Sequence, residues 1–190
     1  MDYKKIYHIS IKLITDPAGA WEEIHTDNSY RDSMDDFVYP WLTICGSAMF
    51  LGSMTIAGWQ LSALPIALKA GCSVFVSLFA GYFLSVALIT RMSPRIAGRS
   101  LPRETACTLT SYSMVVVFAL KLADGILGGL PGVIYSFLAF YTLAVVFASA
   151  RKYIGVDDTH ITWFTIITSL TVIFSPSIIS TIFNKLINTI

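Results

Sequence analysis

The sequence predicts an all-α protein, a polytopic membrane bundle of five transmembrane helices. Three observations support this fold class. Hydrophobic residues make up 55% of the 190 residues and charged residues only 13%, whereas a soluble domain carries about 25% charged residues. The mean hydropathy is +0.67. Five stretches also have the roughly 20 mostly apolar residues that a helix needs to cross a bilayer.

The five apolar stretches divide the chain into two parts. Residues 1–37 are predicted to form cytoplasmic interfacial helices and a linker, and residues 38–190 the transmembrane domain. Pro176 lies inside the last span and should kink it, with Ser175 or Ser177 helping to satisfy the freed carbonyl. The predicted spans are Val38–Gln60, Leu64–Thr90, Thr105–Leu127, Pro131–Ala150 and Thr162–Ile187.

The first fifteen residues have the pattern of an amphipathic helix. Two interpretations fit this pattern, and they are compatible: the helix lies on the anionic cytoplasmic leaflet, or it packs on the protein's own cytoplasmic face. At 100° per residue, one arc of about 100° holds the polar side chains, namely Lys4, Lys5, His8, Lys12 and Thr15.

A second short helix is predicted to follow. Asp16 and Pro17 have the residue types of an N-cap and a first helical position. The helix should then run through Trp21 and Ile24. Residues 27–36 are acidic and are predicted to form a linker.

The distribution of lysine and arginine predicts the orientation. Ten of the 13 fall in the N-terminal segment and in the loops after the second and fourth spans, whereas the opposite side holds only Lys185. Cytoplasmic loops carry the excess of positive charge, so the N-terminus is predicted to be cytoplasmic and the C-terminus outside. The ten are Lys4, Lys5, Lys12, Arg31, Arg91, Arg95, Arg99, Arg103, Arg151 and Lys152.

Three short stretches resemble the bacterial branch of the Yip1 family of five-span membrane proteins. Residues 16–24, DPAGAWEEI, are similar to the family's Pro-x3-Trp-x2-Ile ahead of the first span. The second stretch is the loop with Gly98 that leads to the Tyr-Ser pair at 112–113, and the third is the short loop around Gly155. The resemblance assigns motif roles to Pro17, Trp21, Ile24 and Tyr112.

The resemblance implies an integral membrane scaffold in the bacterial inner membrane, acting through lipid and protein contacts without catalysis. Its expected partners are membrane lipids, further copies of the chain or other membrane proteins. Eukaryotic relatives act in vesicle trafficking and contact Rab GTPases, a role that is not carried over to this bacterial-looking chain. The family often has a proline soon after its Tyr-Ser, and its absence here argues against a kinked third helix.

Three ionisable residues lie within the predicted spans: Lys69, Lys121 and Asp124. Intramembrane charges are costly and therefore count as candidates for a functional site. The alternative function is a small oligomeric transporter or channel that uses these three residues as an intramembrane cluster. Another interpretation is structural, in which Lys121 pairs with Asp124 while Lys69 snorkels to the outer surface.

Basic residues of the N-terminal helix and of the loop after the second span are predicted to face lipid or an acidic partner. The alternative is that they only set the topology. These residues are Lys4, Lys5, Lys12, Arg91, Arg95, Arg99 and Arg103.

Small and hydroxyl residues recur at helix spacing, which predicts close helix packing within the bundle or a homo-oligomer face. The small pairs are Ala67 with Gly71, Gly125 with Gly129 and Ala144 with Ala148, and the hydroxyl cluster comprises Thr162, Thr165, Thr168, Ser169 and Thr171.

No catalytic residue, metal ligand set or cofactor is predicted. The sequence has no GxSxG, HExxH or P-loop motif and no Gly-rich dinucleotide turn. Asp157, Asp158 and His160 have metal-ligand chemistry but favour a solvated loop, since no further ligands are in register. A net charge of +1 excludes a basic surface for nucleic acid. The cysteines, Cys45, Cys72 and Cys107, are interpreted as buried small hydrophobic residues.

Overall fold

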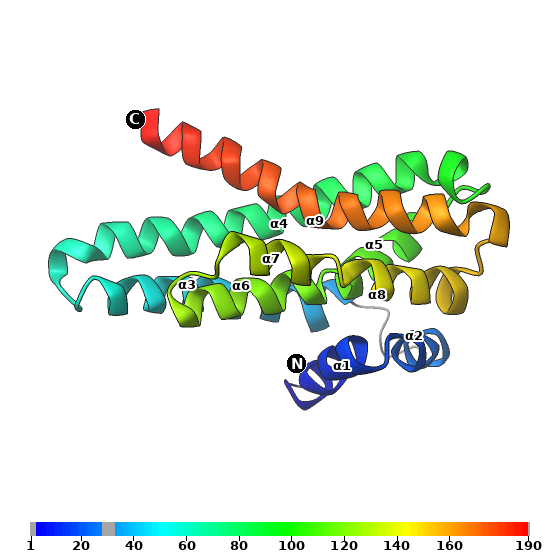
Figure 1. The fold of residues 1–190 in the computed structure, drawn as a ribbon, viewed down its shortest axis with the longest axis horizontal. Helices are drawn as coiled ribbons and strands as arrows, with labels where there is room; N and C mark the ends of the chain where they lie inside the picture. Colours follow the sequence, from blue (N-terminus) through cyan, green and yellow to red (C-terminus); the bar gives the residue numbers. More distant parts are fainter. Residues whose placement is uncertain (1–2, 28–32, 190) are drawn as a thin grey trace.

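The structure, a computed structural model, describes residues 3–27 and 33–189 (Figure 1). All regular structure in these residues is helical, which confirms the all-α part of the predicted fold class. Five helical stretches are long and apolar enough to cross a membrane, as expected of an integral membrane protein. They are Met34–Ile56, Leu61–Ile96, Arg103–Leu127, Gly132–Ile154 and Asp158–Ile187.

Each span has its own internal construction. The first joins the π-helical turn η2 to α3, the second joins a 3-10 turn to α4, the third and fourth are interrupted, and the fifth is one long helix. In chain order the elements are α1 (Tyr3–Thr15), α2 (Pro17–Thr26), η2 (Met34–Val38), α3 (Tyr39–Ile56), η3 (Leu61–Ala63), α4 (Leu64–Ile96), α5 (Arg103–Ser113), α6 (Val115–Leu127), α7 (Gly132–Ala139), α8 (Thr142–Ser149), η4 (Ala150–Ile154) and α9 (Asp158–Thr189).

Two predicted boundaries need correction. The linker predicted for residues 27–36 is too long, because η2 already begins at Met34 and continues into α3. It buries Phe37, which gives this acidic stretch an apolar anchor. Arg31, one of the ten basic residues of the orientation argument, lies outside the described residues.

The second correction concerns α4, which continues past its predicted end at Thr90 to Ile96. Pro94 lies within this extension and has no N–H to bond to the carbonyl of Thr90. The hydroxyl of Ser93 donates to that carbonyl instead (2.9 Å). The helix can therefore pass the proline without leaving the carbonyl unsatisfied.

Helix α3 lies between α4 and α6, and glycines make both approaches close (Figure 1). A Cβ at Gly71 of α4 would lie 3.0 Å from the carbonyl oxygen of Gly46 in α3. A Cβ at Gly52 of α3 would overlap the carbonyl of Gly125 in α6. Close backbone approach at small residues is the usual way that helices pack inside membranes.

Helices α4 and α9 pack antiparallel along much of their length. A Cβ at Gly81 would lie 2.7 Å from the Cα of Pro176, so the proline inside α9 sits on a glycine of α4. Helix α9 passes through Pro176 without ending, and Ser177 donates to the carbonyl of Ile173 (3.5 Å). Polar links flank the crossing, with Ser85 donating to the carbonyl of Thr171 (3.4 Å) and Ser73 to Oδ1 of Asn184 (2.9 Å).

The third span is interrupted at Met114, between α5 and α6, although no proline is present. Hydroxyls of α5 donate to carbonyls one turn back, for example Thr110 to Ala106 (2.7 Å) and Ser111 to Cys107 (2.8 Å). Such back-bonding bends helices. The N–H of Met114 still donates to the carbonyl of Thr110 (3.0 Å) and its carbonyl accepts from the N–H of Phe118 (2.9 Å), so α5 and α6 form one span.

Candidate functional site

The loops at residues 97–102 and 155–157 lie at the same end of the bundle, which we call the arginine-rich end (Figure 1). The guanidinium of Arg99 donates to the carbonyl of Ile154 and so ties the two loops together. Gly98 has a φ of +69°, and a Cβ there would lie 3.1 Å from the ring of His160. The loop at residues 97–102 thus packs on the two elements that flank residues 155–157, η4 and α9.

Ser93 fixes the path of the chain from α4 to α5. Its side chain is fully buried. Besides donating to the carbonyl of Thr90, its Oγ accepts a hydrogen bond from the N–H of Leu101 (3.0 Å). This second bond folds the loop back onto the end of α4, and Arg103 begins α5 two residues later.

A cavity of about 390 Å³ lies between the end of α4 and the start of α5. Its apolar wall is formed by Phe83, Val86 and Ala87 of α4, which precede Arg91 on the same face of the helix. Thr90 also lines the cavity, and its hydroxyl is buried and has no hydrogen-bond partner among the described residues. The lining residues are Phe83, Val86, Ala87, Thr90, Arg91 and Arg103.

The four arginines of this end do not act as one group. Arg91 and Arg103 line the cavity. Arg99 is held by the carbonyl of Ile154 and lines a neighbouring cavity with His25. All four arginines are exposed, but Arg95, which lies one turn beyond Arg91, is not among the residues lining the first cavity.

Residues of the predicted family motif meet in an aromatic cluster. Trp21 of α2 is fully buried and donates its Nε1–H to the carbonyl of Val145 in α8 (2.9 Å). Its ring lies 6.1 Å from Tyr112 of α5, edge on, and 5.4 Å from Tyr153 of η4. Ile24, one turn after Trp21, is also buried. The structure thus brings Trp21 and Tyr112 together, although they are far apart in the sequence.

Pro17 serves the start of α2 rather than the cluster itself. It stands in the first turn, and the carboxylate of Asp16 accepts a hydrogen bond from the N–H of Gly19 (3.1 Å). This is the predicted cap geometry. Lys12 of α1 pairs with Glu23 of α2 at 2.6 Å, so the two N-terminal helices are also joined by charge.

Helix α1 has three faces of about 80–100° each, by the 100° per residue of an α-helix. One face is buried against the protein and consists of Ile6, Ile9, Ser10 and Leu13. The next is apolar but exposed and consists of Tyr3, Tyr7, Ile11 and Ile14. The third is the predicted polar arc of Lys4, Lys5, His8, Lys12 and Thr15.

Helix α1 is held on the flank of the bundle, against α6. The hydroxyl of Tyr141, between α7 and α8, donates to the carbonyl of Ile14 (2.6 Å), and Trp41 of α3 donates to Ser10 (3.2 Å). The helix is therefore docked on the helical bundle through both apolar and polar contacts.

Lys121 and Asp124 of the third apolar stretch form a pair that faces the turn between α6 and α7. The Nζ of Lys121 lies 3.7 Å from Oδ2 of Asp124 and 5.1 Å from the centre of the Tyr135 ring. The other carboxylate oxygen accepts a hydrogen bond from the N–H of Leu130 (2.8 Å). Both oxygens of Asp124 are thus engaged in holding this turn.

Lys69 is placed elsewhere. It lies on α4, four residues before Ser73, whose hydroxyl bonds to Asn184 of α9. Residues four apart share a helix face, so Lys69 lies on the side of α4 that faces α9. Since α3 lies between α4 and α6, the structure does not group Lys69 with Lys121 and Asp124.

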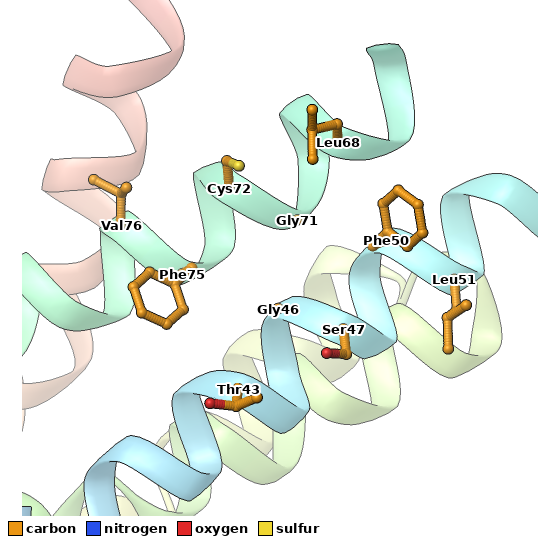
Figure 2. Close-up of a pocket in the computed structure, with 10 residues that line it drawn as sticks. All are labelled: Thr43, Gly46, Ser47, Phe50, Leu51, Leu68, Gly71, Cys72, Phe75 and Val76. Atoms are coloured by element: carbon orange, nitrogen blue, oxygen red, sulfur yellow. The ribbon is translucent and has the colours of Figure 1, made fainter. Parts of the chain in front are cut away.

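The small residues of the spans are used mainly within the chain. Figure 2 shows the groove where α3 and α4 meet at Gly46 and Gly71. Cys72 lines this groove and is exposed, which corrects the prediction that all three cysteines are buried. Beside Gly46 and Gly71, the groove is lined by Thr43, Ser47, Phe50, Leu51, Leu68, Cys72, Phe75 and Val76.

The two remaining predicted clusters are the Asp157, Asp158 and His160 group and the hydroxyl residues of the fifth span. Asp158 pairs with Arg151 at 3.8 Å, while His160 packs over Gly98. Within residues 3–27 and 33–189, no three His, Cys, Asp or Glu side chains are grouped as a metal site. Of the hydroxyls predicted on the fifth span, Thr165, Thr168 and Ser169 are buried, and Thr162 is exposed.

Sequence reasoning missed Thr90 and Ser93. A usable signal exists for Ser93, which directly precedes Pro94 and can replace the hydrogen bond that a proline removes. The comparisons with known proteins add no further residues, because no family model, curated protein or solved structure matches the chain.

Proposed function

We propose that this chain is a non-catalytic membrane scaffold of the Yip1 type, located in the bacterial inner membrane with its N-terminus and arginine-rich end in the cytoplasm. It acts through lipid and protein contacts. The observation that carries the proposal is the three-faced helix α1, since a helix packed only on its own protein needs one apolar face, and α1 has an additional exposed one.

The order of the faces fits a helix lying in the membrane interface. The buried face points to the bundle, the exposed apolar face to the acyl chains and the lysine-bearing face to the headgroups. Interfacial helices bury their apolar face about 5–10 Å into the headgroup region. A lysine face suits the anionic cytoplasmic leaflet, and the positive-inside distribution supports the same orientation.

Photo-crosslinking in native membranes tests the placement of α1. A benzophenone amino acid at Tyr7, on the exposed apolar face, should give phospholipid adducts detectable by mass spectrometry. The same group at the neighbouring His8, on the polar arc, should give several-fold fewer. Equal yields at both positions, or none at Tyr7, would contradict an interfacial α1.

The alternative is a small oligomeric transporter or channel that uses Lys69, Lys121 and Asp124. The engagement of Asp124 by Lys121 and Leu130 supports a structural role for that pair. Purified protein in liposomes should therefore leave ion and solute flux at background. Flux that disappears in Lys69→Ala or Asp124→Ala would favour the transporter over the scaffold.

A further inference from the structure

We propose that the cavity between α4 and α5 binds the phosphate headgroup of an anionic phospholipid through Arg91, Arg103 and Thr90. The inference rests on the proposed function and deepens it, because it names the lipid class that the arginine-rich end holds. A lipid bound here would join the two helices at the loop that Ser93 folds back.

The donors of the cavity match a phosphate. Arginine offers several N–H donors in a planar fork that fits phosphate oxygens. Neither Arg91 nor Arg103 has an ion pair with a carboxylate among the described residues. The buried hydroxyl of Thr90 also has no hydrogen-bond partner there, so it is available as a third donor.

The N-terminus of α5 adds to the positive electrostatic potential at the cavity between α4 and α5. Its N-cap is Pro102, which provides no side-chain cap for the first N–H groups of the helix. Uncapped N–H groups and the helix dipole favour an anion at an N-terminus. Glu104 follows in the first turn but is not among the residues that line the cavity.

The position along α4 favours a lipid over a soluble anion. From Leu64 to Arg91 the helix rises by about 40 Å, at 1.5 Å per residue, whereas the hydrocarbon core is about 30 Å thick. Arg91 therefore lies at headgroup level. Phe83 lies about 12 Å deeper by the same rise. Together with Val86 and Ala87 it gives the cavity an apolar wall on which an acyl chain can lie.

The two guanidinium groups favour a lipid with a net negative charge over a zwitterionic one. In a zwitterionic headgroup, the lipid's own ammonium group partly neutralises the phosphate. An acidic peptide or free phosphate would supply the same anionic chemistry but would leave the apolar wall uncovered. These alternatives are separate arms of the test.

Native mass spectrometry of the full-length protein in detergent measures lipid binding directly. The probes are phosphatidylglycerol, phosphatidylcholine of the same chain length and glycerol 3-phosphate. We expect preferential retention of phosphatidylglycerol, and at least about tenfold weaker binding in the double variant R91Q/R103Q, because charge-assisted hydrogen bonds are lost. R95Q removes one charge one turn from Arg91 and is the matched control for the single variant R91Q; R95Q should keep the binding nearly unchanged, whereas R91Q should weaken it.

The proposal would be overturned by equal binding of phosphatidylcholine, by equal binding of glycerol 3-phosphate, or by a loss in R95Q equal to that in R91Q. The last would indicate diffuse electrostatic attraction. The R91K/R103K variant keeps the charge and guards against misfolding, and it should bind more tightly than R91Q/R103Q. If R91Q/R103Q binds phosphatidylglycerol as well as wild type while Tyr7 still crosslinks to lipid, the cavity proposal fails and the scaffold proposal stands.

Discussion

Ser93→Ala is the substitution that most specifically tests how the arginine-rich end is built. The hydroxyl of Ser93 serves two backbone groups, the carbonyl of Thr90 and the N–H of Leu101. Ser93 is fully buried and Leu101 is 5% exposed, so water has little access to replace either bond. Each buried group left unsatisfied costs about 1–3 kcal/mol, which gives a loss of roughly 2–6 kcal/mol for the pair.

Unfolding in mixed micelles, followed by circular dichroism as denaturing detergent is added, measures this loss. Even the lower bound corresponds to an unfolding constant raised roughly 30-fold. Ser100→Ala is the matched control, because Ser100 lies in the same loop with an exposed side chain. A Ser93→Ala protein as stable as the Ser100→Ala protein would refute the role assigned to the hydroxyl.

Three further substitutions test the packing of the bundle, each followed by the same unfolding measurement. Gly52→Ala should destabilise the protein strongly or prevent folding, because the added Cβ would overlap the Gly125 carbonyl. The control Gly132→Ala has open space around it and should change stability by no more than about 1 kcal/mol. Equal effects of the two substitutions would contradict the close approach of α3 and α6. Trp21→Ala should cost about 3–5 kcal/mol, since it empties a fully buried site, and a loss below about 1 kcal/mol would argue against the docking of α2. Asp124→Ala should cost roughly 1–3 kcal/mol, because it removes the acceptor of one backbone N–H and the partner of Lys121; an unchanged stability would show that the pair does not hold the turn.

The length of the apolar stretches was sufficient to predict the five helices, because a spanning segment must satisfy its own backbone and must be apolar along its length. The end of α4 was not predictable in this way. Its last two turns carry Arg91 and Pro94, which usually mark the end of a span, and the compensating bond from Ser93 depends on a side-chain rotamer. The interruption at Met114 likewise depends on local hydroxyl bonding rather than on a proline.

The candidate site was predictable only in part. Spacing of three residues was enough to predict that Lys121 and Asp124 share a helix face. It did not predict the neighbours of that face, and the place of Lys69 relative to this pair depends on α3 lying between α4 and α6. Arg91 and Arg103 line one cavity and Arg99 lines another because of the way the loop at residues 97–102 folds. Hydropathy and charge counts carry no information about the fold of that loop.

The lipid proposals depend on the arginine-rich end lying in the cytoplasm, and a reporter at the C-terminus tests this most directly. With the full chain expressed in a bacterial host, alkaline phosphatase fused after Ile190 should be active, and a green fluorescent protein fused at the same point should stay dark. A fluorescent fusion with an inactive phosphatase would place α1 and the arginine cavity on the opposite leaflet and would contradict the account.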